Sequence, residues 1–214
     1  NCQNTLISEI LKVQKNVVIV LHNGSPIEMP WVNDVNAILE TYLCGQAVGA
    51  AAVNILFGKA NPCGKLAETF PLKLEDNPSF LNFPGNGRTV EYREGVFVGY
   101  RYYDTKKMPV LFPFGHGLSY TTFDYSDFKL TSYDTLKDVY NFSIKVTNTG
   151  EVVGKDAVQL YLQKPYTDYD IEHNIEKSAV ELVAFNKTDL LEPNASKTYY
   201  FVVWIDETGD IQTD

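Results

Sequence analysis

The sequence predicts an α/β domain with a mainly parallel sheet, followed by an incomplete all-β immunoglobulin-like sandwich. In the first third, short β-branched runs alternate with stretches of helical periodicity, an order typical of parallel sheets. Beyond residue 123, apolar residues recur with period two between turn residues, which indicates short antiparallel strands. The predicted divisions are 1–75 for the α/β domain, 76–123 for an aromatic-rich linker and packing strand, and 124–214 for the sandwich.

The α/β part is predicted from periodicity and from turn residues. The run Val17–Leu21 is apolar on both faces, which suits a buried parallel strand. A short helix is expected around Trp31 because Pro30 occupies an early helical position. The predicted elements are helices over 4–15, 29–32 and 45–58 and strands over 16–21, 37–43 and 67–71.

The stretch 45–58 organises this domain. Its apolar residues recur at helical spacing, and Gly58 is suited to the left-handed turn that ends a helix. Two interpretations compete for it: an anion bound at the helix N-terminus, or a buried helix whose alanines allow close packing on the sheet. Gly45, Gly49 and Gly58 do not have the spacing of a phosphate-binding or dinucleotide-binding loop, so close packing is favoured.

The loops after the two strands are the candidate site, because ligands of open α/β sheets bind beyond the carboxyl ends of the strands. His22, Asn23 and Ser25 follow the first strand, and the turn 43–46 follows the second. His22 is a candidate general base or partner of a sugar hydroxyl, although such a histidine often only bonds loop carbonyls.

Residues 72–90 are predicted to be an exposed loop, and residues 91–104 a strand. Residues 111–121 are predicted to form a compact loop. The aromatic residues of this region fit sugar stacking, but packing between domains explains them more simply. Its carboxylates are candidates for acid/base chemistry, or simply a charged strand face: Glu91, Glu94 and Asp104.

The sandwich is predicted from five runs: 125–130, 139–148, 157–163, 180–185 and 197–203. Residues 147–150 are predicted to be a hairpin turn. Sandwiches of this type usually have about seven strands. We therefore expect the chain to stop, at residues 209–214, before the last strands, leaving an open edge.

The formal net charge of −9 argues against nucleic acid and anionic membranes as partners. The three cysteines, Cys2, Cys44 and Cys63, lack the spacing of a disulfide framework or a zinc site. They favour a reducing compartment, the cytoplasm rather than secretion, so the sequons at Asn141, Asn186 and Asn194 carry little weight. No metal or cofactor is expected. The chain begins without Met or a signal peptide and looks cut from a longer protein.

Five stretches in register resemble the C-terminal part of family 3 glycoside hydrolases of the β-glucosidase type. They cover most of the chain: VVIVLHNGSPIEMPW at 17–31, GQAVGAAAVNILFGKANPCGKLAETFP at 45–71, YREGVFVGYRYYD at 92–104, LFPFGHGLSYTTF at 111–123 and TNTGEVVGKDAVQLYLQ at 147–163. The departures from the family pattern are Cys63 where Ser is usual, Ala47-Val48 in a more glycine-rich turn, and the segment 166–177 without its usual Arg-Pro.

The resemblance implies an upstream (β/α) barrel, then the α/β domain, then a fibronectin type III-like domain. It also implies a retaining hydrolase of terminal β-glucosyl residues, with two carboxylates about 5–5.5 Å apart. Both carboxylates would lie upstream of Asn1, so no catalytic residue is assigned here and the substrate-binding residues stay unknown. Alternatives are a β-xylosidase or α-arabinofuranosidase of the same family, or a non-catalytic module that binds carbohydrate or protein. Monomer and homo-oligomer both stay open.

Overall fold

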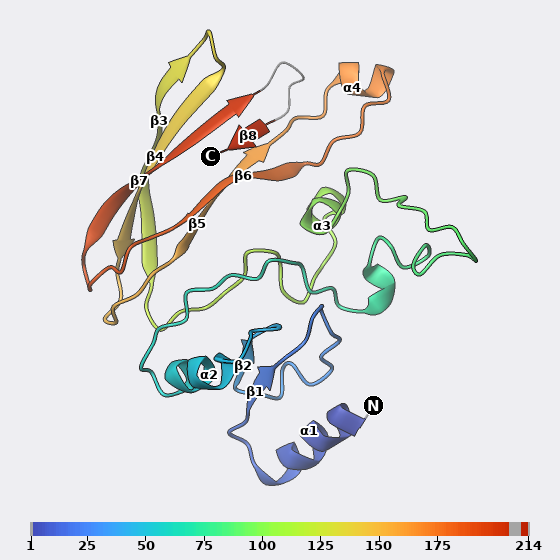
Figure 1. The fold of residues 1–214 in the computed structure, drawn as a ribbon, viewed down its shortest axis with the longest axis vertical. Helices are drawn as coiled ribbons and strands as arrows, with labels where there is room; N and C mark the ends of the chain where they lie inside the picture. Colours follow the sequence, from blue (N-terminus) through green and yellow to red (C-terminus); the bar gives the residue numbers. More distant parts are fainter. Residues whose placement is uncertain (1, 206–210, 214) are drawn as a thin grey trace.

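The structure is a computed structural model that describes residues 2–205 and 211–213. Figure 1 shows a smaller helix-containing part at one end and a larger β-rich part at the other, with α3 between them. The elements are α1 (Cys2–Val13), β1 (Val18–Leu21), β2 (Ala37–Glu40), α2 (Val48–Leu56), η1 (Leu74–Asp76), α3 (Tyr100–Lys106), β3 (Phe123–Asp134), β4 (Val139–Asn148), β5 (Ala157–Gln163), α4 (Asp168–Glu172), β6 (Val180–Lys187), β7 (Ser196–Ile205) and β8 (Ile211–Thr213).

The predicted parallel sheet is confirmed by β1 and β2, which pair in parallel from Val18 opposite Ala37 to Leu21 opposite Glu40. Beneath them lies a small core of Met29, Trp31 and Phe70. The indole nitrogen of Trp31 donates to the side-chain oxygen of Asn4, 3.0 Å away, which fastens α1 to this core. The helix predicted over 4–15 is therefore present, slightly earlier in the chain.

Two short elements of this part are predicted wrongly. Residues 29–34 form successive tight turns instead of a helix, with Val32 N donating to Met29 O and Asp34 N to Trp31 O. A helix would place Met29 and Trp31 about 200° apart, whereas the turns bury both side chains. The edge strand predicted over 67–71 is reduced to one antiparallel bridge between Phe70 and Phe112.

Helix α2 ends as predicted, since Gly58 adopts a φ of +70° just beyond it. The prediction that this helix is buried against the sheet is wrong within the described chain. Ala52 is its one buried residue, and a methyl group added to Gly49 would meet no atom within 4 Å. The apolar side chains of α2 therefore face space that the described residues leave open.

The strand predicted over 91–104 is also wrong, because residues 93–96 form a turn and α3 begins at Tyr100. Gly95 and Gly99 have φ values of 58° and 55°, outside the range of an extended strand. The helix lets Tyr103 enter the interior while Tyr100 stacks on Phe114, with ring centroids 4.7 Å apart. The loops predicted over 72–90 and 111–121 are present, apart from η1.

The β-rich part contains the five predicted strands, β3 to β7, in two sheets. The order is β3-β4-β7-β8 in one sheet and β5-β6 in the other, all antiparallel. The hairpin predicted at 147–150 is wrong, because β4 pairs with β3 and β7 while β5 lies in the other sheet. The last residues were predicted to hold no strand; β8 occupies 211–213, and residues 209, 210 and 214 lie outside the described residues.

One core joins these two sheets. It combines Ile144 and Val146 of β4, Val158 of β5, Val183 and Ala184 of β6, Leu191, and Tyr199, Phe201 and Val203 of β7. The fully buried Asn148 stabilises the connection from β4 to β5 through hydrogen bonds of its side chain. Its amide nitrogen donates to Val152 O and Leu191 O, and its oxygen accepts from Thr121 Oγ1 at 2.6 Å and from Gly150 N at 3.1 Å.

Asn61 and Lys65 connect the two parts. The Asn61 side chain donates to Val153 O and accepts from Ser119 Oγ at 2.8 Å. Lys65 Nζ lies 3.0 Å from Asp156 Oδ1 and donates to Gly117 O. These polar contacts tie the α/β part to the β-rich part.

Candidate functional site

The carboxyl ends of β1 and β2 bring together the residues predicted to follow these strands. His22 Nδ1 lies 2.9 Å from Thr41 Oγ1, a contact that joins the two strand ends, and His22 is otherwise exposed. Asn23 Nδ2 donates to Ser25 O at 2.8 Å, whereas Asn23 Oδ1 is buried without a partner. His22 therefore acts as a local link here, and Asn23 presents an unused acceptor.

The turn 43–46 follows β2 as predicted but is exposed throughout. Cys44 Sγ donates to Thr41 O, and Gly45 O accepts from Val48 N at 3.2 Å. The N-cap residue of α2, Ala47, offers no capping side chain. None of these contacts favours the anion interpretation of the helix N-terminus.

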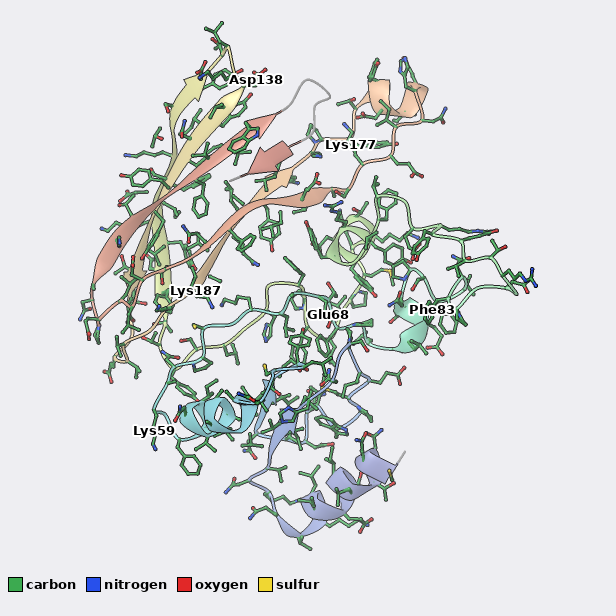
Figure 2. All side chains as sticks on the ribbon, in the orientation of Figure 1. Lys59, Glu68, Phe83, Asp138, Lys177 and Lys187 are labelled. Carbon is green, nitrogen blue, oxygen red and sulfur yellow. The ribbon has the colours of Figure 1, made fainter. Side chains whose placement is uncertain are left out.

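Three residues that the sequence analysis missed complete this edge: Glu40, Tyr42 and Glu68. Glu40 Oε1 accepts from Tyr42 N at 2.7 Å, but Glu40 Oε2 is buried without a partner. Tyr42 has a φ of 46°, a left-handed conformation that is uncommon for a bulky residue. Its hydroxyl is buried near Glu68 without meeting hydrogen-bond geometry. Figure 2 shows Glu68 between the two parts of the molecule.

The pKa values reflect this crowding of acceptors. Burial, helped by the carboxylates of Glu68 and Glu40, raises the pKa of Tyr42 to about 12. Burial also raises the pKa of Glu68; the Tyr42 phenol opposes this shift and the Glu40 carboxylate adds to it. Asn23, Glu40 and Tyr42 thus hold buried polar atoms without partners at one sheet edge. Such atoms are costly unless another group bonds them, so we call Asn23, Glu40, Tyr42 and Glu68 the sheet-edge cluster.

A signal for part of this cluster was present in the sequence. The predicted second strand, 37–43, contained Glu40 and Tyr42, but the observed strand β2 already ends at Glu40, so the strand-end rule applies to Glu40 and Tyr42. The turn predicted at 43–46 lies slightly too far along the chain. Glu68 arrives from a distant segment, and the left-handed backbone of Tyr42 has no sequence signature.

The three carboxylates predicted near the aromatic residues lie in different surroundings. Glu91 forms an exposed ion pair with Arg93. Burial raises the pKa of Asp104 in α3. Glu94 keeps one oxygen, Oε2, buried without a partner. Glu91, Glu94 and Asp104 therefore lie in three different local environments and do not form one catalytic group in the described part of the chain.

Within residues 2–205 and 211–213, no group of three or more His, Cys, Asp or Glu side chains is arranged to hold a metal ion. All three cysteines are free thiols. The described helices include none with the length and apolar character needed to cross a membrane.

Comparison with known proteins gives consistent results. Residues 1–120 match the model of the glycosyl hydrolase family 3 C-terminal domain. The chain is 52% identical over 202 residues to thermostable beta-glucosidase B of Acetivibrio thermocellus, covering 94% of this chain and 26% of that protein. The chain therefore spans about a quarter of this curated relative.

Solved structures resemble the fold over nearly its full length. The beta-glucosidase from Kluyveromyces marxianus in complex with glucose superposes with a TM-score of 0.84 at 37% identity, covering 100% of this chain and 26% of that one. A family 3 beta-glucosidase from Bifidobacterium adolescentis gives 0.85 at 36% identity, covering 99% and 31%.

The match over residues 1–120 agrees with the parallel β1–β2 pair and the helix that follows it. This chain therefore belongs to the glycosyl hydrolase family 3 C-terminal domain family.

Proposed function

We propose that this chain is the C-terminal part of a retaining glycoside hydrolase that removes terminal non-reducing β-D-glucosyl residues. The observation that carries the proposal is the match to a beta-glucosidase at 52% identity over 94% of the chain. Because the chain spans 26% of that relative, the barrel nucleophile and the acid/base Glu belong to an upstream part in this proposal.

The chain's own role, in this proposal, is to form one wall beside the catalytic carboxylates without contributing either. The sheet-edge cluster supports this role, because its unpartnered acceptors lie beyond the carboxyl ends of parallel strands, where α/β folds bind ligands. Donor groups of the upstream part would satisfy Asn23 Oδ1 and Glu40 Oε2. In this proposal, the oligosaccharide or β-glucoside is hydrolysed at that assembled site.

We also propose the domain divisions 1–75, 76–123 and 124–214, the last being fibronectin type III-like. The two antiparallel sheets around one core support this assignment, as does the passage of the chain from β4 in one sheet to β5 in the other.

The test is an assay of three samples on a chromogenic β-glucoside: this chain, the upstream part, and the two mixed or fused. The proposal expects no turnover by the chain alone and turnover by the assembled protein. Turnover by the chain alone would refute the upstream location of the carboxylates. Inactivity of an assembled, folded protein on β-glucosides would refute the proposed activity.

The same assay separates the sibling specificities. Chromogenic β-xyloside and α-arabinofuranoside are given to the assembled protein at equal concentration. We expect the β-glucoside to have the highest kcat/KM of the three. A higher kcat/KM for either pentoside would refute the β-glucosidase assignment and favour the β-xylosidase or α-arabinofuranosidase activity instead.

A further inference from the structure

Two neighbouring hollows lie around α3, where the segment 93–97 and the segment 164–179 approach this helix. One, of about 340 Å³, is lined in part by Glu94, Tyr102 and Lys106. The other, of about 480 Å³, is lined in part by Lys164, Tyr166 and Lys177. Both are lined by Phe97 and Thr105, so the two hollows adjoin, and together we call them the α3 groove.

The walls of the α3 groove are held in place by specific contacts. Thr105 Oγ1 accepts a hydrogen bond from Ala179 N at 3.0 Å, which joins α3 to the segment that leads into β6. Lys177 Nζ lies 2.7 Å from Asp170 Oδ2, and the Tyr166 hydroxyl donates to Ile175 O at 3.0 Å. Figure 2 labels Lys177 on the stretch between α4 and β6, opposite α3. The groove is therefore built from residues with fixed positions.

The charges of the groove favour a neutral ligand over an anion, because most of its cations are already paired with carboxylates. Lys177 is already paired with Asp170, and Lys164 with Glu181, so a phosphate would compete with existing carboxylates. Lys106 lies over the Tyr102 ring, 4.9 Å from its centroid. Glu94 lines the first hollow, and its carboxylate keeps one oxygen, Oε2, without a hydrogen-bond partner.

Aromatic faces beside charged donors and acceptors are the chemistry that binds a neutral polyhydroxylated ligand. Phe97 and Tyr166 offer apolar surface to a sugar ring, and Glu94 offers an acceptor to a hydroxyl. The hollows lie within the range of small-molecule sites, roughly 300–1,000 Å³.

We propose that the α3 groove binds a short neutral oligosaccharide, with Phe97 under a sugar ring and Glu94 accepting from a hydroxyl. The choice of a β-linked gluco-oligosaccharide as ligand rests on the proposed function. The segment 166–177 contributes Tyr166, Glu176 and Lys177 to the lining of the groove.

The experiment is a titration of the 214-residue chain with cellotetraose, followed by backbone amide shifts in two-dimensional NMR. We expect saturable shifts at residues 93–97, 102–106 and 176–179, with half-saturation on the order of 1 mM. Phe97→Ala should weaken binding about tenfold. Glu94→Gln, an isosteric change that leaves the fold intact, should weaken it about threefold.

The matched control is Phe185→Ala, because Phe185 lies on β6, is 74% exposed and does not line the groove. It should bind cellotetraose as the unchanged chain does. Absence of saturable shifts, shifts confined to the sheet-edge cluster, or equal shifts with inorganic phosphate would overturn the proposal. The titration needs no turnover, so the groove fails separately from the proposed function: an assembled protein that hydrolyses β-glucosides while this chain binds no cellotetraose refutes the groove alone.

Discussion

The α/β part and the β-rich part bury their apolar residues to very different extents. In the β-rich part, the two sheets enclose a core of their own, with Val146 fully buried and Phe201 5% exposed. In the α/β part, α1 has no buried residue and α2 has one. Phe57, at the end of α2, is 76% exposed. In Figure 1, α1 and α2 lie toward the outside of the smaller part.

The two parts therefore depend on different surroundings for their stability. A folded domain gains most of its stability from apolar surface removed from water. The β-rich part achieves this with its own residues, whereas the helices of the α/β part present apolar faces that the described residues do not cover. Together with the unpartnered acceptors of the sheet-edge cluster, this favours a partner surface on the α/β part, which the proposed upstream part would supply.

The largest expected effect compares two phenylalanines. Phe201→Ala should lower the free energy of unfolding by about 3–5 kcal/mol, because it leaves a cavity in the core of the two sheets. Phe57→Ala should change it by less than about 0.5 kcal/mol in the chain alone, because the ring is mostly in water. Urea denaturation followed by circular dichroism measures both. Equal losses for the two variants would contradict the contrast between the parts.

The connection between the two parts gives the next effect. Lys65→Met should cost about 2 kcal/mol, because it leaves the largely buried Asp156 without its cation. The matched control is Lys12→Met on α1, which breaks an exposed pair with Glu9 and should cost less than about 0.5 kcal/mol. Thermal unfolding of both variants provides the measurement. A loss for Lys65→Met as small as that for Lys12→Met would mean that the Lys65–Asp156 pair contributes little to the connection between the parts.

The smallest effect depends on pH and is lost at low pH. A hydrogen bond from Lys177, with further bonds from Thr167, lowers the pKa of Asp170 to about 2. Because the folded pKa lies below the unfolded value of about 3.9, this carboxylate stabilises the fold above pH 4 and loses its contribution as the pH falls toward 2.

The measurement is the melting temperature of the unchanged chain and of Asp170→Asn between pH 6 and pH 2. The difference should be largest at pH 6 and shrink toward pH 2. Asp168→Asn, which removes an exposed carboxylate from the same helix, is the control and should show no such convergence. A gap for Asp170→Asn that stays constant with pH would assign the effect to packing instead of charge.

Sequence patterns predicted the elements best where local periodicity and tertiary packing agree. The strands of the β-rich part alternate regularly, so β4 and β5 were predicted at their observed bounds. The strand predicted over 91–104 failed because Gly95 and Gly99 take left-handed backbone, and distant partners such as Phe114 decide how Tyr100 packs.

The sequence predicted where the candidate site lies, at the carboxyl ends of the parallel strands, but not most of the residues that form it. The strand-end rule located Asn23, whose side chain does lie at the edge of the sheet with an unused acceptor. Glu68 could not be predicted, because it reaches Tyr42 from a segment far along the chain. The division of the strands between two sheets could not be predicted either. The turn residues at 147–150 resemble a hairpin, but the buried side chain of Asn148 donates hydrogen bonds to Val152 O and Leu191 O. The chain then continues into the other sheet.

Amide hydrogen exchange of this chain, alone and joined to the proposed upstream part, tests the central claim most directly. The account predicts that β1, β2 and α2 exchange quickly in the chain alone and gain strong protection on joining, while β4 to β7 are protected in both samples. Equal and strong protection of β1, β2 and α2 in the chain alone would show that the α/β part needs no partner surface, and would contradict the account.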